Sequence, residues 1–173
     1  MRYGYFDNKN REYVIDRVDV PVSWTNYIGL KDMYGVFNHT AGGYLLYKTP
    51  EYHRITRFRP NGVPMDGPGH YIYLRDDDTG EYWTVSWQPV GSDREKYTCR
   101  HGLSYSKYIC DVGDIHAQQT LFVAVDDPVE IWNLKLRIGD ISELVGYADT
   151  AHFARTFKRI EGISANEYRN KLL

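Results

Sequence analysis

The sequence predicts an α+β protein in which strands and helices occupy separate parts of the chain: an antiparallel β-sandwich, a partial supersandwich, is followed by a small helical segment. Up to residue 136 the chain reads as short strands rich in tyrosine and separated by turns, whereas residues 141–173 carry apolar residues at helical spacing. Fourteen of the 16 tyrosines and all four tryptophans lie before residue 133. We therefore expect two modules, residues 1–136 and residues 138–173.

Composition narrows the classes of function. A chain of 173 residues that is 42% hydrophobic can bury the core of one ordinary domain, with room for a small appendage. Its net charge of -2 argues against a nucleic-acid binder that is basic over its whole surface. The chain shows neither a signal peptide nor an apolar run near the roughly 18 residues of a membrane span. With two cysteines, Cys99 and Cys110, we expect a soluble cytoplasmic protein with free thiols and no membrane partner.

The strands of the first module are predicted from alternating aromatic runs that flank turn residues. Residues 3–6 and 12–15 flank the tract 7–10, and residues 71–75 and 82–86 flank the tract 76–80, so each pair predicts a hairpin. No segment before residue 130 has helical periodicity. Further strands are predicted at residues 44–48, 53–59, 97–109, 118–125 and 129–136.

The helices of the second module are predicted from three consecutive patterns. A first helix places Ile141, Leu144 and Val145 on one face before the turn at Gly146. A second helix, with Asp149 suited to cap it and Gly162 to end it, repeats an apolar stripe. The sequence Ser-Ala-Asn-Glu at residues 164–167 is a capping box for a third helix through residue 173. The stripe of the second helix consists of Phe153, Phe157 and Ile160.

Several side chains of the first module have both a functional and a structural interpretation. Four aromatic residues could stack on sugar rings, although in a tyrosine-rich sandwich such rings are mostly core. Cys99 and His101 could share a strand face and form an activated thiol, although a buried structural cysteine is more common. The Asp76–Asp77–Asp78 tract is interpreted as a solvated hairpin tip, and we expect no metal and no cofactor. The four candidate sugar-binding aromatics are Trp24, Tyr44, Trp83 and Trp87.

Six stretches of the first module carry a resemblance to a known family: residues 3–7, 24–29, 38–44, 56–59, 83–87 and 99–105. Together they resemble the amino-terminal region of cellobiose and cellodextrin phosphorylases. The resemblance implies that residues 1–136 form part of a large β-supersandwich, which in that family precedes a helical linker and an (α/α)6 barrel. Because the barrel carries the general acid and most of the phosphate site, no catalytic residue can be carried over, and we expect no enzyme activity.

The second module resembles the final helix-turn-helix of AraC/XylS-type transcription regulators, through residues 141–149, 153–159, 162–164 and 167–169. The resemblance implies that residues 150–160 form a recognition helix whose Thr150, Ala151, His152 and Arg155 face DNA bases. Residues 150–160 carry three positive charges and no acid, and Lys158 and Arg159 are placed to contact phosphates. That family uses two such motifs, and this chain has one, so a homodimer would restore two half-sites.

Three interpretations of the chain follow from these patterns. The leading hypothesis is sequence-specific DNA binding and transcription regulation, with a β module in front that binds carbohydrate or serves for dimerisation. The alternative is a non-catalytic carbohydrate-binding module or an inactive phosphorylase fragment. A third interpretation is a fused or remnant reading frame, in which half of a sandwich would expose strand edges.

Overall fold

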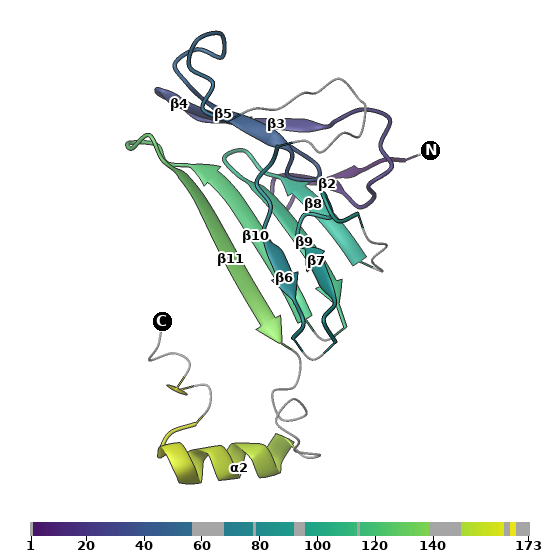
Figure 1. Ribbon diagram of the computed structural model, residues 1–173, viewed down its shortest axis with the longest axis vertical. Coiled ribbons are helices and arrows are strands. Elements are labelled where there is room, and N and C mark those ends of the chain that lie inside the picture. Colours follow the sequence, from purple (N-terminus) through teal and green to yellow (C-terminus); the bar gives the residue numbers. More distant parts are fainter. Residues whose placement is uncertain are drawn as a thin grey trace. The chain divides into compact units, whose positions relative to one another are not determined.

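The computed structural model describes residues 2–56, 68–77, 79–91, 96–113, 115–138, 150–164 and 167–168 (Figure 1). Contacts within the chain divide it into two compact units. The front unit spans Met1–Arg137 and the tail unit spans Ile138–Leu173. Each unit is described by itself.

The largest element of the front unit is a six-stranded sheet with the strand order β1-β2-β8-β9-β10-β11. Neighbouring strands pair antiparallel from β1 through to β10. Figure 1 shows β11 as a long strand at one edge of this sheet. The bounds are β1 Tyr5–Asp7, β2 Glu12–Ile15, β8 Lys96–His101, β9 Ser106–Val112, β10 Ile115–Val123 and β11 Glu130–Ile138.

Two smaller antiparallel sheets complete the front unit. The three-stranded sheet contains β3 Thr25–Ile28, β4 Met33–Asn38 and β5 Gly43–Tyr47. The two-stranded sheet pairs β6 Tyr73–Arg75 with β7 Tyr82–Thr84.

All three sheets contribute to one core. Phe37 of β4, Trp83 of β7 and Tyr108 of β9 are buried in the same apolar cluster. Two phenols of the six-stranded sheet also donate hydrogen bonds to backbone oxygens near the end of β4. Tyr97 Oη lies 2.6 Å from the His39 oxygen, and Tyr108 Oη lies 2.8 Å from the Asn38 oxygen. The two larger sheets are therefore joined by directional bonds as well as by apolar contact.

Most of the expected strands of the front unit are observed. Both hairpins are confirmed as β1–β2 and β6–β7, and β5, β10 and β11 match the predicted runs at residues 44–48, 118–125 and 129–136. The run at residues 97–109 is two strands and not one, because the Gly102 amide donates to the Tyr105 oxygen (2.9 Å) and closes a turn. Of the run at residues 53–59, Arg54 makes only an isolated bridge to Leu46, and residues 57–59 lie outside the described residues.

In the described part of the tail unit there is one α-helix, α2, Thr150–Glu161. Gly162 follows it with a φ of 74°, the left-handed conformation in which glycine commonly ends a helix. The capping box is confirmed: the Ser164 amide donates to Glu167 Oε2 (2.8 Å), and the Glu167 amide donates to Ser164 Oγ (3.2 Å).

The expected three-helix arrangement is not seen. The predicted first helix and the Asp149 cap fall on residues 139–149, outside the described residues, and only Glu167 and Tyr168 of the third helix are described with its cap. Phe157 is half-buried and its ring packs edge-on against Tyr168, with centroids 5.7 Å apart. Ile160, expected on the same apolar stripe, is exposed. Among the described residues no helix is long and apolar enough to cross a membrane.

Candidate functional site: an aromatic pocket in the front unit

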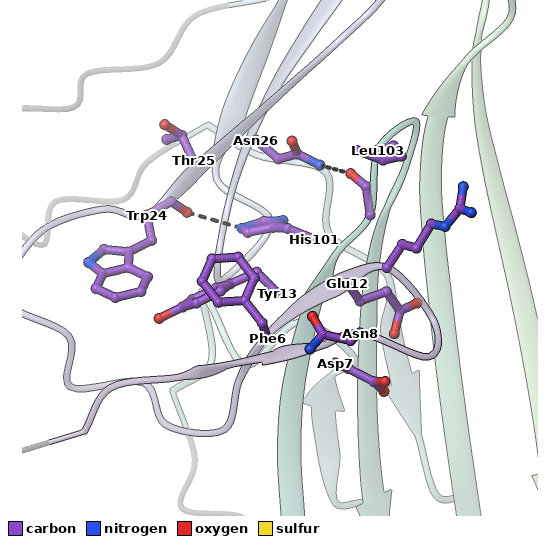
Figure 2. A pocket seen from close by; sticks show the side chains of 12 residues that line it. Phe6, Asp7, Asn8, Glu12, Tyr13, Trp24, Thr25, Asn26, His101 and Leu103 are labelled. Carbon is purple, nitrogen blue, oxygen red and sulfur yellow. Dashed lines mark hydrogen bonds between the residues drawn. The ribbon is translucent and has the colours of Figure 1, made fainter.

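A pocket of about 670 Å³ opens where three distant segments of the front unit meet. The β1–β2 hairpin supplies one wall, the start of β3 supplies a second, and the turn between β8 and β9 supplies the third (Figure 2). The volume is within the range of pockets that hold small ligands. The lining residues are Phe6, Asp7, Asn8, Arg11, Glu12, Tyr13, Trp24, Thr25, Asn26, His101, Gly102 and Leu103.

Three aromatic side chains form one apolar wall of this pocket. Phe6 and Tyr13 are opposite each other in the β1–β2 register, and their ring centroids are 4.9 Å apart. Trp24 continues the row, with its centroid 5.3 Å from that of Tyr13. Figure 2 shows the three rings gathered on one side of the pocket. Phe6 is 76% exposed, so an apolar ring face at the mouth remains open to a ligand.

Glu12 is the carboxylate at the base of the β2 wall, and it is engaged by three donors. Its Oε1 accepts hydrogen bonds from Tyr105 Oη (2.6 Å) and Lys107 Nζ (2.9 Å), and its Oε2 accepts one from Arg100 (2.9 Å). Burial by itself would raise the pKa of Glu12, but these bonds outweigh it and the pKa is lowered. The bond to Glu12 is also the main reason why the pKa of Tyr105 rises to about 12.

Asp7 stands next to Glu12 in the hairpin and is also engaged. Its carboxylate accepts from the Asn10 side chain (2.8 Å), the Asn10 amide (3.2 Å) and Arg100 (3.2 Å). These bonds, with the Asn10 side chain contributing most, lower the pKa of Asp7. Both carboxylates of the pocket are therefore ionised at neutral pH and are used for structure.

His101 is fixed at the back of the pocket by two hydrogen bonds. Burial is the main cause that lowers the pKa of His101 to about 4, so the ring is neutral at pH 7. Its Nε2 lies 3.2 Å from the Trp24 oxygen, which can only accept, so Nε2 carries the proton. Nδ1, 2.9 Å from Ser106 Oγ, then accepts the hydroxyl hydrogen. The imidazole thus positions the Trp24 backbone.

Asn26 joins the β3 wall to the β8–β9 turn. Its side-chain nitrogen donates to the Gly102 oxygen (2.9 Å) and to the Tyr105 oxygen (3.1 Å), and Figure 2 shows the bond to the turn. Gly102 is required at this point, because a Cβ there would lie 2.6 Å from the Tyr105 ring. The polar walls are thus held in place before any ligand arrives.

The pocket is equipped for binding and not for proton transfer. Its carboxylates are held ionised by ion pairs, and its histidine is neutral with both ring nitrogens engaged. General acid–base catalysis requires a group that can exchange a proton near neutral pH, and none of these three groups meets that requirement. An apolar ring face beside polar side chains is, in contrast, a surface suited to a sugar ring.

The structure does not bring the four candidate sugar-binding aromatics together. Trp24 lines the pocket. Trp83 is 2% exposed and belongs to the core, so its faces are not accessible from solution. Trp87 is half-buried against the same core, and Tyr44 of β5 carries the Arg54 guanidinium over its ring at 4.7 Å.

Of the twelve lining residues, only Trp24 was predicted from the sequence to bind a ligand, and those that the sequence analysis missed include Phe6, Tyr13, Asn26 and His101. The signal for Phe6 and Tyr13 was the register of the first hairpin, which aligns the two rings on one face. Asn26 and His101 reach the pocket through contacts across about 75 residues of chain, and no local pattern encodes such contacts.

Cys99 and His101 do lie close together, with the sulfur 3.7 Å from His101 Nε2. The thiol is nevertheless fully buried, and burial raises its pKa well above the ordinary value. A neutral, inaccessible thiol is not a nucleophile, so the structural interpretation of Cys99 holds. Cys110 is likewise a buried thiol outside any disulfide.

The candidate DNA-binding residues all fall on α2. Thr150, Ala151 and His152 occupy its first turn, and Lys158 and Arg159 its last turn, where cations also stabilise the helix dipole. Arg155, Lys158 and Arg159 are exposed, and their spacing of three and four residues places them on one helix face.

Most of the chain matches the model of one known protein family. Residues 11–139 match the supersandwich domain of glycosyl hydrolase 94. The chain is 57% identical to the N,N'-diacetylchitobiose phosphorylase of Vibrio proteolyticus over 139 residues, which are 79% of this chain and 17% of that protein. It is 34% identical to the solabiose phosphorylase of Paenibacillus borealis over 135 residues, covering 78% of this chain and 18% of that protein. The chain therefore spans less than a fifth of the length of these relatives.

A second, shorter match covers the tail. Residues 133–170 match the model of bacterial regulatory helix-turn-helix proteins of the AraC family. The match includes α2 and the capping box at Ser164 and Glu167, and it also includes residues 139–149, which lie outside the described residues. Both resemblances read from the sequence are thereby confirmed.

Proposed function

The chain belongs to the glycosyl hydrolase 94 family through its supersandwich domain, and from this premise we propose that the front unit is a non-catalytic module that binds a disaccharide of N-acetylglucosamine. The observation that carries the proposal is the aromatic pocket, in which Phe6, Tyr13 and Trp24 line one wall and the acidic and imidazole groups are already engaged. The relative with 57% identity is named for N,N'-diacetylchitobiose, which gives the ligand to test first.

The aromatic wall accounts for the apolar part of the recognition. The ring hydrogens of a β-linked pyranose form an apolar face that can lie on Trp24 or Phe6, and the polar walls can then meet the hydroxyl and acetamido groups. Asn8, Arg11 and Thr25 supply donors and acceptors at these walls. A shallow site of this kind supports an affinity on the order of 1 mM.

Titration with N,N'-diacetylchitobiose tests the proposal, with chemical shifts of the backbone amides of the pocket residues and, in variants that retain Trp24, of the tryptophan indole groups as the readout. We expect saturable shifts for the full chain and roughly tenfold weaker binding for Trp24→Ala, about 1.4 kcal/mol. Phe6→Ala should weaken binding less. Tyr52→Ala is its matched control, because Tyr52 is 77% exposed and lies outside the pocket. Unchanged amide and indole shifts in millimolar disaccharide would refute sugar binding.

The same module is proposed to lack phosphorolytic activity. The carboxylates of Asp7 and Glu12 and the His101 ring are held in forms that do not exchange a proton near neutral pH, and phosphorolysis also requires a phosphate site. Incubation of the full chain with N,N'-diacetylchitobiose and inorganic phosphate should release no sugar phosphate. Release that is abolished by a pocket substitution would overturn this part of the proposal.

A second function, DNA binding by the tail unit, is favoured by the match of residues 133–170 to the AraC-family model. In this proposal Thr150, Ala151, His152 and Arg155 meet base edges, and Lys158 and Arg159 meet phosphates. One such motif makes few phosphate contacts, so non-specific dissociation constants of about 10⁻⁴ to 10⁻⁶ M are expected.

Fluorescence anisotropy of the full chain with a random DNA duplex pool, at about 50 and about 200 mM salt, tests this second function. Lys158→Ala should weaken binding to all duplexes and reduce the salt slope by about 1, whereas Arg155→Ala should also relax sequence preference. Lys9→Ala, on the β1–β2 turn, is the control. No binding at the lower salt would exclude DNA as a partner.

A further inference from the structure

The two edges of the six-stranded sheet are very different. At one edge β1 has three residues, Tyr5–Asp7, and such a short strand offers little backbone for pairing. At the other edge β11 has nine residues, Glu130–Ile138, and none of them is proline or glycine. Within the described part of the chain, no strand follows β11 in the sheet order. β11 therefore presents a long, regular row of backbone donors and acceptors.

The side chains of β11 alternate between an apolar and a polar face. Trp132, Leu134 and Leu136 project to one face, and Asn133, Lys135 and Arg137 project to the other. The three apolar side chains remain 43%, 37% and 46% exposed. This alternation is typical of a strand with one covered face, yet the face is only partly covered.

The beginning of the same face contains buried polar atoms without partners. His70 Nε2 lies 3.3 Å from Glu130 Oε1, in a geometry that forms no hydrogen bond. His70 Nδ1, Glu130 Oε1 and Gln119 Oε1 are buried and have no hydrogen-bond partner among the described residues. The His70 ring is held between Phe37 and Trp132 at 5.0 and 5.5 Å. The hydrogen bonding of these buried groups is therefore incomplete, in contrast to that of the polar groups in the pocket.

We infer that β11 pairs antiparallel with β11 of a second copy of this chain, centred on Leu134. A two-fold axis through the centre of an antiparallel pair requires one residue of the strand to lie opposite itself, because hydrogen-bonded and non-hydrogen-bonded pairs alternate along the ladder. With Leu134 at the axis, Trp132 of each copy lies opposite Leu136 of the other. The apolar face then continues across the pair.

The charges of β11 favour this register over its neighbours. Centred on Leu134, the pairing uses all nine residues, and it places Lys135 opposite Asn133 and Arg137 opposite Ile131. Centred on Lys135, the pairing would place two ammonium groups opposite each other, which is destabilising. Centred on Asn133, the pairing would use only seven of the nine strand residues.

Analytical ultracentrifugation of the full chain tests the inference. We expect a concentration-dependent dimer. Leu134→Lys places two cations at the axis and should weaken the dimer by roughly tenfold or more. Leu30→Lys is the matched control, because Leu30 is an exposed leucine on the β3–β4 turn, and it should dimerise like the original chain. Circular dichroism confirms that each variant is folded.

Asn133→Glu tests the register itself. Centred on Leu134, the new carboxylate faces Lys135 of the partner twice, and the dimer should tighten by roughly two- to fivefold. If Asn133 were at the axis, two carboxylates would face each other and the dimer would weaken. A monomer at every concentration, a dimer insensitive to Leu134→Lys, a weaker Asn133→Glu dimer or an open-ended assembly would each overturn the inference.

Discussion

Glu12 and Glu130 each begin a strand of the same six-stranded sheet, and their surroundings differ in almost every respect. Glu12, at the start of β2, accepts hydrogen bonds from Tyr105, Lys107 and Arg100, and its pKa is lowered. Glu130, at the start of β11, is buried beside His70, and burial raises its pKa to about 7 although a hydrogen bond with Trp132 partly opposes this. The first carboxylate stabilises the fold in its charged form, whereas the second is tolerated best in its neutral form.

The largest expected effect is that of Glu12→Gln. The substitution removes the carboxylate partner of Lys107 and leaves Arg100 with Asp7 alone, and we expect the free energy of unfolding at pH 7 to fall by about 3 kcal/mol. The pKa of Glu12 in the folded protein is below its ordinary value of 4.5. The Glu12 carboxylate therefore adds to the free energy of unfolding above pH 4.5, and this stabilisation is lost as the pH falls through the folded pKa. Urea denaturation at pH 7 and at pH 3 should therefore show a smaller deficit at pH 3. Glu51→Gln, at an exposed glutamate, is the control.

The same substitution at Glu130 should have the opposite sign. The folded pKa of about 7 exceeds the ordinary 4.5, so native Glu130 lowers stability progressively as the pH rises from 4.5 to 7, by up to about 3 kcal/mol. Because a buried amide has its own unmet hydrogen bonds, we expect Glu130→Gln to gain about 1–2 kcal/mol at pH 8. The gain should be small at pH 5, where Glu130 is protonated.

Urea denaturation at pH 8 and pH 5 measures this difference. His70 and His101, with pKa values lowered to about 4, have the opposite pH dependence. Their neutral rings stabilise the folded protein above pH 6.5, and this stabilisation is lost as the pH falls toward 4. Both proteins contain these histidines, so their contribution largely cancels in the stability difference measured between the two proteins at each pH. If Glu130→Gln were instead less stable than the original protein at pH 8, the Glu130 carboxylate would have to be stabilised in its charged form by more than the contacts of the structure indicate.

The smallest effect is expected at a third glutamate, Glu167 of the capping box. Glutamine can replace glutamate in this motif, so Glu167→Gln should change stability by less than about 0.5 kcal/mol. Ser164→Ala removes the reciprocal bond and should reduce helix content in far-ultraviolet circular dichroism more clearly, at a cost of about 1 kcal/mol. Equal effects of the two variants would mean that the serine hydroxyl does not cap this turn.

Sequence patterns predicted the strands that alternate around turn residues and missed β3 and β4. The hairpins β1–β2 and β6–β7 follow from alternation around turn residues. β4, Met33–Asn38, is buried at five of its six positions, so it shows no alternation to detect. The domain boundaries at residues 136 and 138 remain predictions.

The pocket was harder to foresee than the fold. Only Trp24 among its twelve lining residues had been assigned a sugar-binding role, because its three walls come from segments far apart in the chain. A charged residue at an inward position of a strand was a usable signal at Glu12, which shares a face with Val14. Its partners Arg100 and Lys107 are about 90 residues away and are identifiable only from the fold.

The two phenols that cross between the larger sheets limit how those sheets can slide. Apolar surfaces tolerate several alignments of similar energy, whereas a buried hydroxyl 2.6 Å from a carbonyl oxygen tolerates only one. Because Tyr97 and Tyr108 bond two adjacent backbone oxygens, those of His39 and Asn38, they hold the end of β4 at one place on the six-stranded sheet. Loss of both hydroxyls would therefore leave a protein that still collapses but populates a set of sheet alignments instead of a single one.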